Sequence, residues 1–219
     1  MTDLADMTLD ELRLALAPAV AESAIFDGWS EAAVRAAAEG AGVDPAVALL
    51  AYPGGAMDMI AAWIASIDAA MAAAFPPERV ATMKIRERIR ALVAFRLESM
   101  AGNEEALRRA LAILAMPHNA AQAVKLGWHS ADVMWRLAGD TATDYNHYTK
   151  RAILASIYAA TLAVFVGDES EGKADTMAFL DRRIDGIMQF EKAKARWLNP
   201  DRESFSMTRF LGRLRYPAR

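Results

Sequence analysis

The chain has 219 residues, no cysteine and a formal net charge of −3 at pH 7. This length suffices for one large domain with a sizeable core. The lack of cysteine excludes disulfides, thiolate metal sites and thiol catalysis. The first residues are acidic, so we expect no secretory signal, which would need a basic start and an apolar core.

The charge is unevenly distributed along the chain. Residues 1–78 contain two basic and twelve acidic residues, whereas residues 79–219 contain 23 basic and 16 acidic residues. The asymmetry indicates different partners for the two ends, or solvated faces of mixed sign.

The hydrophobic periodicity is helical throughout and predicts an all-α bundle of about ten helices. Four helices are expected in the front part, at 9–25, 30–39, 45–51 and 57–74. Three follow in the middle, at 78–100, 103–115 and 118–137. The last three are expected at 140–166, 173–198 and 203–216. We expect three regions: 1–76, 77–199 and 200–219.

The stretch 140–166 has a polar, aromatic first half and an uncharged second half, 152–166. A helix that is apolar all round is buried on every side. This pattern predicts a central core helix whose first turns form an aromatic, charged surface. The basic run Lys84, Arg86, Arg88 and Arg90 is interpreted mainly as a solvated face.

Residues 26–52, FDGWSEAAVRAAAEGAGVDPAVALLAY, resemble the helix-turn-helix of TetR-type repressors. DNA reading needs polar and basic side chains on the recognition helix, but 45–51 has none. An acidic module also repels phosphates. We therefore expect a degenerate motif kept for packing and no nucleic-acid partner. A TetR-type regulator that senses an apolar ligand remains the alternative function.

Residues 143–151, TDYNHYTKR, with their continuation through 152–161 and the segment 176–185, resemble one family across nearly the whole chain. It is the lipid-binding accessory protein family of ubiquinone biosynthesis, found in mitochondria and alphaproteobacteria. The resemblance implies a TetR-like fold without DNA binding and an apolar pocket for a prenylquinone or phospholipid. It also implies docking on the demethoxyubiquinone hydroxylase, with no catalysis and no cofactor.

The resemblance implies a partner-binding patch at the start of the central helix. The family motif carries over to Asp144 and Tyr148, and His147 stands where it has a tryptophan. Tyr145 and Arg151 are expected in the same patch, because helical spacing places Asp144, Tyr148 and Arg151 on one face. Aromatic and sulfur-containing apolar residues at helical spacing are either core or pocket, and the resemblance favours the pocket. The expected lipid-binding residues are Trp63, Met83, Met116, Trp128, Met134, Trp135, Tyr158, Leu162 and Phe165.

The final helix, 203–216, combines an apolar stripe with arginines, a pattern that suits an anionic membrane surface. The expected membrane-contacting residues are Phe205, Met207, Arg209, Phe210, Leu211, Arg213 and Leu214. Alternatively, the stripe packs on the parent domain or on a second copy. We expect a homodimer in the bacterial cytoplasm, peripherally associated with the inner membrane.

The sequence shows no set of catalytic residues. The three histidines, His118, His129 and His147, do not complete the paired Glu-x-x-His motifs of a di-iron bundle. No zincin, dinucleotide-binding, phosphate-loop or nucleophile-elbow motif is present. We therefore expect neither a metal site nor an enzyme.

Overall fold

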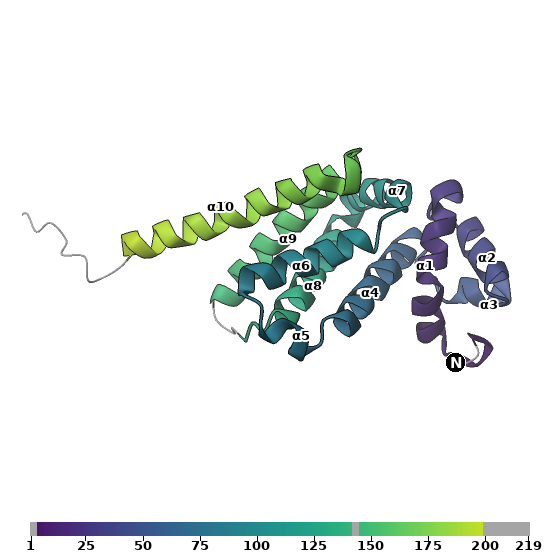
Figure 1. The fold of residues 1–219 in the computed structure, drawn as a ribbon. Helices are drawn as coiled ribbons and strands as arrows, with labels where there is room; N and C mark the ends of the chain where they lie inside the picture. The colour runs from purple at the N-terminus through teal and green to yellow at the C-terminus, as the bar shows by residue number, and fades with distance from the viewer. Residues whose placement is uncertain (1–3, 142–144, 199–219) are drawn as a thin grey trace, which may run out of the picture. The chain divides into compact units, whose positions relative to one another are not determined.

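The computed structural model describes residues 4–141 and 145–198, without the side chains of residues 5, 145, 146, 188 and 190–198. These parts of the chain form ten α-helices and three short 3-10 helices, without a strand, so the all-α prediction is confirmed (Figure 1). The front part contains η1 (Leu4–Asp6), α1 (Leu9–Asp27), α2 (Glu31–Gly40), α3 (Pro45–Leu50) and α4 (Ala56–Ala74). Next come α5 (Pro77–Ala81), α6 (Ile85–Glu98), α7 (Glu104–Leu114), η2 (Pro117–Asn119) and α8 (Ala120–Leu137). The remaining elements are α9 (Tyr145–Phe165), η3 (Glu171–Lys173) and α10 (Ala174–Leu198).

Local signals in the sequence set several helix ends. Thr8 caps α1 in a capping box, in which the Thr8 amide donates to Glu11 at 2.9 Å. Asp44 accepts from the Ala46 amide at 2.8 Å, and Pro45 occupies the first position of α3. Gly28 ends α1 at φ 67°, a conformation that costs glycine little.

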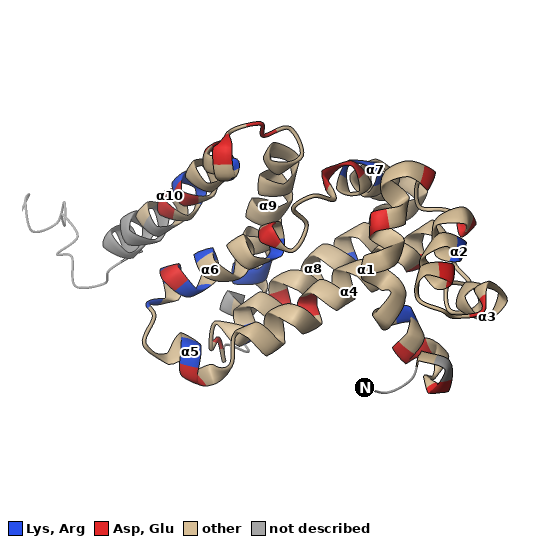
Figure 2. Ribbon diagram, turned by 45° about the vertical axis from the view of Figure 1, so that its right-hand side comes forward, with Lys and Arg blue, Asp and Glu red and all other residues tan. Residues whose placement is uncertain are grey.

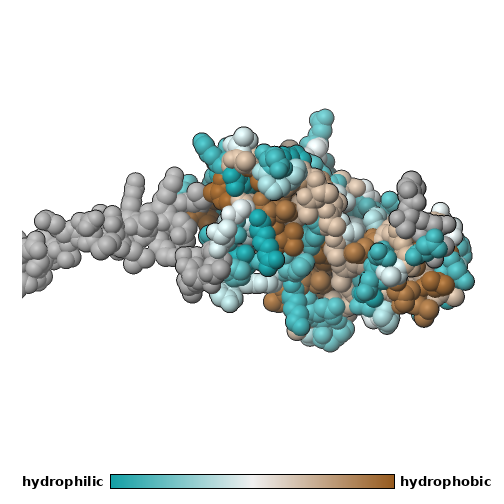
Figure 3. Space-filling model, turned by 90° about the horizontal axis from the view of Figure 1, so that it is seen from below, coloured by the Kyte–Doolittle hydropathy of each residue, from teal (hydrophilic) through white to brown (hydrophobic). Residues whose placement is uncertain are grey.

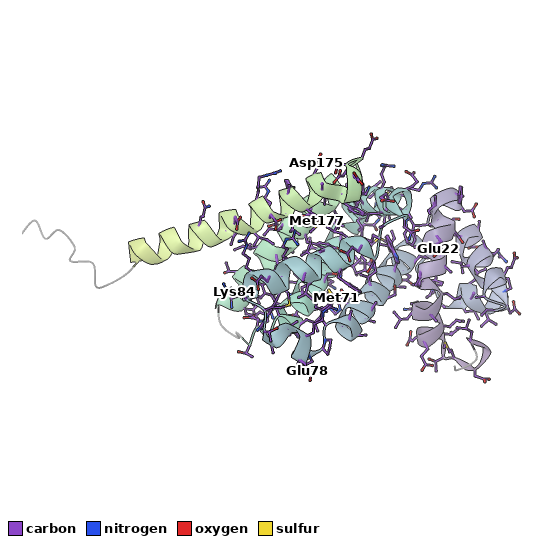
Figure 4. All side chains as sticks on the ribbon, viewed as in Figure 1. Glu22, Met71, Glu78, Lys84, Asp175 and Met177 are labelled. Atoms are coloured by element: carbon purple, nitrogen blue, oxygen red, sulfur yellow. The ribbon has the colours of Figure 1, made fainter. Side chains whose placement is uncertain are left out.

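Helix α4 connects the front of the chain to the bundle. It packs against α1 on one side and against α6, α7 and α8 on others. Its side chains Ile60, Trp63 and Met71 are almost fully buried, and Met71 lies inside the bundle (Figure 4). Among the described residues, only α4 is long and apolar enough to cross a membrane. Its partners and burial show instead that it acts as a core helix in this fold.

The three front helices form the degenerate helix-turn-helix, and Trp29 attaches them to the bundle. The Trp29 indole donates to the Ala106 carbonyl at 2.9 Å, and its ring centroid lies 5.4 Å from that of Trp63. Acidic side chains outnumber basic ones on α1–α3 (Figure 2). Apolar surface is exposed at this end of the molecule (Figure 3), where Val47 and Leu50 of α3 are 42% and 64% exposed.

The single helix expected at 78–100 is wrong, because the chain breaks into α5 and α6. Lys84 is extended at ψ 152°, and its amide donates to the Glu87 carboxylate at 3.0 Å, which starts α6. The Arg88 side chain donates to the carbonyls of Met83 at 2.9 Å and Ala138 at 2.8 Å. It thereby satisfies carbonyls that helix ends leave open.

The basic run on α6 is therefore only partly a solvated face. Arg88 is committed to backbone carbonyls, and Arg90 forms a two-pronged pair with Asp181, at 2.6 and 3.2 Å. Lys84 and Arg86 are exposed at the start of α6, where Figure 4 shows Lys84.

The prediction that the second half of α9 is buried on every side is also wrong. The small residues Ala152, Ser156, Ala159 and Ala163 form an exposed stripe along one side. Larger side chains such as Leu154 and Phe165 lie on the buried side, 2% and 1% exposed. Small side chains and bulky ones are thus divided between the two faces, although neither face carries a charge.

Residues up to Asp181 form one compact unit, and Arg182 begins a second. The boundaries expected near 76 and 200 stay predictions, although α4, from the first expected region, packs on helices of the second. The expected helix 203–216, with all seven membrane-contacting residues, lies outside the described residues, as does Asp144.

Asp168 stabilises the connection between α9 and α10. Its carboxylate accepts from the amides of Ser170 and Thr176, each at 2.8 Å, and from both hydroxyls. These hydrogen bonds hold the pKa of Asp168 well below its usual range.

We expect Asp168→Ala to lower the melting temperature at neutral pH. A depressed folded-state pKa contributes stability above the unfolded-state pKa of about 4, and this contribution is lost as the pH falls further. The melting-temperature gap between wild type and variant should therefore narrow below about pH 4. Glu169→Ala, at an exposed neighbouring position, is the control. A gap that is constant from pH 7 to pH 2 would contradict this role.

Candidate functional site

Helices α4, α6, α7, α8 and α9 line a partly open cavity of about 210 Å³. Its walls are mainly aliphatic, from Ile60, Ile64 and Ile67 of α4 to Leu107 and Leu111 of α7. An apolar cavity of this kind can hold an apolar group without leaving polar atoms unpaired.

One part of the wall is polar and deeply buried. Arg96 of α6 is 1% exposed and forms an ion pair with Asp68 of α4. It also donates to the Ser130 hydroxyl of α8 at 3.1 Å, and its guanidinium carbon lies 4.9 Å from the centroid of the Tyr158 ring of α9. Burial pushes the pKa of Asp68 upward, and the Arg96 guanidinium opposes that shift. One charged group thus connects four helices around the cavity.

Three of the nine residues expected to bind lipid line this cavity: Trp63, Tyr158 and Leu162. The other six lie elsewhere in the fold. Met134 and Phe165 are core residues, 0% and 1% exposed. The remaining four are Met83 between α5 and α6, Met116 on the surface before η2, and Trp128 and Trp135 on α8.

Trp128 and Trp135 of α8 both contact the first turns of α9. The Trp128 ring lies 6.1 Å from that of Tyr148, which lies 5.1 Å from the His147 ring. Tyr148 is 63% exposed. The Trp135 indole donates to the Lys150 carbonyl at 3.0 Å and so fixes α8 against α9. We call Trp128, His147 and Tyr148 the aromatic surface.

Arg151 lies beneath this surface rather than on it, since it is 2% exposed. Its guanidinium contacts Asp132 at 2.6 Å, Asp140 at 3.1 Å and the His147 carbonyl at 3.1 Å. Helical spacing predicted that Arg151 and Tyr148 share one exposed face, but only Tyr148 is exposed. The reason is that two carboxylates hold the guanidinium inward. Arg151 supports the first turn of α9 from within.

Lys150 completes this charge network. Its ammonium group contacts Asp140 at 2.6 Å and lies 5.4 Å from the Trp135 ring. Burial acts to raise the pKa of Asp140, but the hydrogen bonds from Lys150 and Arg151 outweigh it, so that pKa lies below the usual range. The side chain of Tyr145 lies outside the described residues, like the whole of Asp144.

Sequence reasoning missed Asp68, Arg96 and Ser130. The sequence did contain a signal for Asp68, which lies four residues after Ile64 and eight after Ile60. This spacing places its charge on the apolar face of the helix. Arg96 follows Leu92 by four positions in the same way. A single charge at a core-facing position is costly unless paired, and the pairing of α4 with α6 could not be read from the sequence.

Within the described residues, no three His, Asp or Glu side chains come together as a possible metal site. The cavity and the aromatic surface are the features that we consider for recognition of a ligand or partner.

Comparison with known proteins identifies a related family. Residues 120–191 match the family model described as COQ9. Over these residues the chain is similar to the COQ9 family. The matched segment contains α8 and α9, and with them the aromatic surface and part of the cavity wall. The family resemblance inferred from the sequence is thus confirmed.

Relatives match over a longer part of the chain. The human mitochondrial ubiquinone biosynthesis protein COQ9 is 30% identical over 186 residues, which cover 82% of this chain and 58% of that protein. The rat protein of the same name is 32% identical over 168 residues, which cover 74% of this chain and 54% of that protein. The chain thus spans somewhat more than half the length of these relatives.

The fold itself resembles a solved structure of another kind. A crystal structure of the TetR transcriptional regulator from Nitrosomonas europaea matches with a TM-score of 0.65 and 21% identity, covering 82% of this chain and 99% of that chain. The similarity confirms the predicted TetR-like architecture, and at this identity it concerns the fold alone.

The buried network under the aromatic surface leads to a stability prediction. Arg151→Ala leaves Asp132 and Asp140 with fewer partners and should lower the free energy of unfolding by about 2 kcal/mol or more. Tyr148→Ala removes a mostly exposed ring and should cost about 1 kcal/mol or less. Urea unfolding of both variants measures the difference. Equal losses would show that Arg151 does not carry the first turn of α9.

Proposed function

We propose that this chain is a non-catalytic, lipid-binding accessory protein of ubiquinone biosynthesis. It holds a prenylated quinone intermediate or a phospholipid and presents it to the demethoxyubiquinone hydroxylase. The apolar cavity lined by α4 and α6–α9 carries the proposal. Supporting it are the printed names of the relatives, which are ubiquinone biosynthesis proteins.

The size of the cavity limits what it can enclose. A dry cavity of about 150 Å³ holds benzene, so about 210 Å³ accommodates a ring or a short chain segment. A long prenyl chain must therefore extend beyond it. This fits a protein that holds a lipid partially and passes it on, rather than one that sequesters it.

The alternative function, a transcriptional regulator, is disfavoured by α3. This helix occupies the place of a recognition helix, yet it exposes Val47 and Leu50 and has no polar or basic side chain. Phosphate contacts dominate nucleic-acid affinity, and the acidic front helices offer few. We therefore propose that the helix-turn-helix serves packing and that the chain binds no DNA.

The aromatic surface is the proposed docking site for the hydroxylase. An exposed tyrosine flanked by other aromatic rings is a typical hot-spot arrangement. His147 gives this surface a polar ring beside Tyr148. The charge network beneath it stabilises the first turns of α9, and a surface that is ordered before binding loses less entropy on binding.

We further propose that residues 203–219 bind the membrane and that the protein is a homodimer at the cytoplasmic side of a bacterial inner membrane. The apolar stripe and arginines of this segment support the membrane contact. Basic residues near an anionic surface contribute about 1 kcal/mol each.

Lipid should co-purify with the protein, because an apolar cavity in a cell fills with an apolar ligand. Leu162→Arg places a charge at the cavity wall and should abolish the bound lipid in native mass spectrometry. Val124→Arg, at a position of α8 that is 71% exposed, should leave it unchanged. Wild-type protein without lipid that is not stabilised by added prenylquinone would argue against lipid binding.

Tyr148→Ala should weaken binding to the hydroxylase by about 2 kcal/mol, which is about thirtyfold in the dissociation constant. Met116→Ala, another exposed apolar position, is the control and should bind normally. Surface plasmon resonance with the purified hydroxylase measures both. Normal affinity of the Tyr148→Ala protein would place the docking site elsewhere.

Deletion of residues 203–219 should abolish flotation with phosphatidylglycerol- or cardiolipin-containing vesicles while the helical signal persists. Binding of the full chain should weaken with salt, because screening reduces the attraction. Equal flotation of truncated and full-length protein would exclude the segment as the membrane contact. Collapse of the helical signal would indicate that the segment packs on the domain instead.

A further inference from the structure

Helix α8 carries a glycine at a position that faces the core. Its later turns bury Ser130, Ala131 and Met134, which are 2%, 0% and 0% exposed. Gly127 precedes these residues by three, four and seven positions, so the helical period places it in the middle of the same buried face. Gly127 is also part of the cavity wall. A position that ordinarily carries a packed side chain therefore carries none.

The space in front of Gly127 is empty. A methyl group on its Cα would meet no heavy atom within 4 Å apart from the backbone of its own helix. In a close-packed interior, a side chain that faces the core instead touches atoms of neighbouring helices. The backbone does not require glycine either, because Gly127 lies inside α8 without a positive φ. The missing side chain thus leaves free volume and relieves neither a clash nor strain.

This glycine is unfavourable for the fold in two ways. Glycine inside a helix is less stable than alanine, because its backbone loses more conformational freedom on folding. Free volume beside core residues also forfeits van der Waals contacts. Alanine would reduce both costs, since its methyl group fits without a clash. A residue that lowers stability and lines a cavity points to ligand binding, where function commonly opposes stability.

We propose that Gly127 sets the size of the apolar group that the cavity accepts. Part of a ring or hydrocarbon chain takes the space that a side chain at position 127 would fill. The cavity wall is mainly aliphatic, so this space suits an apolar group. The inference rests on the proposed lipid-binding function and deepens it, because it names a residue that limits the bulk of the ligand.

Two probes of different size test the proposal on delipidated full-length protein. Isothermal titration calorimetry gives the dissociation constants of benzene and butylbenzene for the wild type and for Gly127→Ala. The added methyl group should weaken butylbenzene binding about fourfold, the contribution of one buried CH₂ group. Benzene should bind both proteins equally, because a cavity of about 150 Å³ already holds it.

The outcomes separate this inference from the function on which it rests. Unchanged butylbenzene affinity in Gly127→Ala, or equal weakening of both probes, would overturn the role of Gly127 and leave lipid binding intact. No binding of either probe to the wild type would overturn the proposed lipid-binding function as well.

The stability of the same variant gives a second readout. Gly127→Ala should raise the melting temperature of the delipidated protein by about 2–4 °C, because alanine favours the helix. Weaker binding together with a higher melting temperature is the opposite of what general damage to the fold produces. A lower melting temperature would show that the position is closely packed and would overturn the inference.

A larger side chain extends the test. Gly127→Leu fills the space and should abolish binding of both probes. Ala121→Leu, at an exposed position of α8 outside the cavity wall, is the matched control and should bind both probes as the wild type does. Wild-type affinities in Gly127→Leu would overturn the proposal, and so would loss of binding in Ala121→Leu. If Gly127→Leu does not fold, the Gly127→Ala measurements decide.

Discussion

The buried pair of Arg96 and Asp68 is the constraint on which the bundle depends. Asp68 belongs to α4 and Arg96 to α6, while Ser130 of α8 and Tyr158 of α9 complete their surroundings. A buried charge must keep its partner, because an unpaired one costs several kcal/mol. Four helices are therefore held in one register, and the cavity between them keeps its shape.

The aromatic surface depends on a second charge network of the same kind. Arg151 holds two carboxylates and a backbone carbonyl at the first turns of α9. The cavity and this surface share α8 and α9, so the helices that line the cavity also carry Trp128 and Tyr148. A lipid bound between these helices and a partner docked on their ends would thus contact the same rigid pair.

The sequence did not reveal the role of the charged residues that face the core. The all-α fold and the helix-turn-helix were accessible, because they depend on periodicity, capping residues and turn glycines. The family was accessible through its resemblance to the motif at 143–151. The exposed Tyr148 was expected from the family's patch motif. Arg151 was wrongly predicted to be exposed, because helical spacing shows which residues share a face but not which face is turned to the core. Asp68 and Arg96 were missed, since they pair with each other across 28 residues of the chain.

The sequence by itself determined most of the helices, the loss of DNA-reading side chains on α3 and the similarity of residues 120–191 to the COQ9 family. The helices and the side chains of α3 are local properties, since each depends on residues within a few turns of one another. Only the tertiary structure decided which apolar residues line a cavity and which fill the core, as Leu162 and Phe165 show. The physical reason is that burial is a property of pairs of helices, and periodicity within one helix does not specify its neighbours.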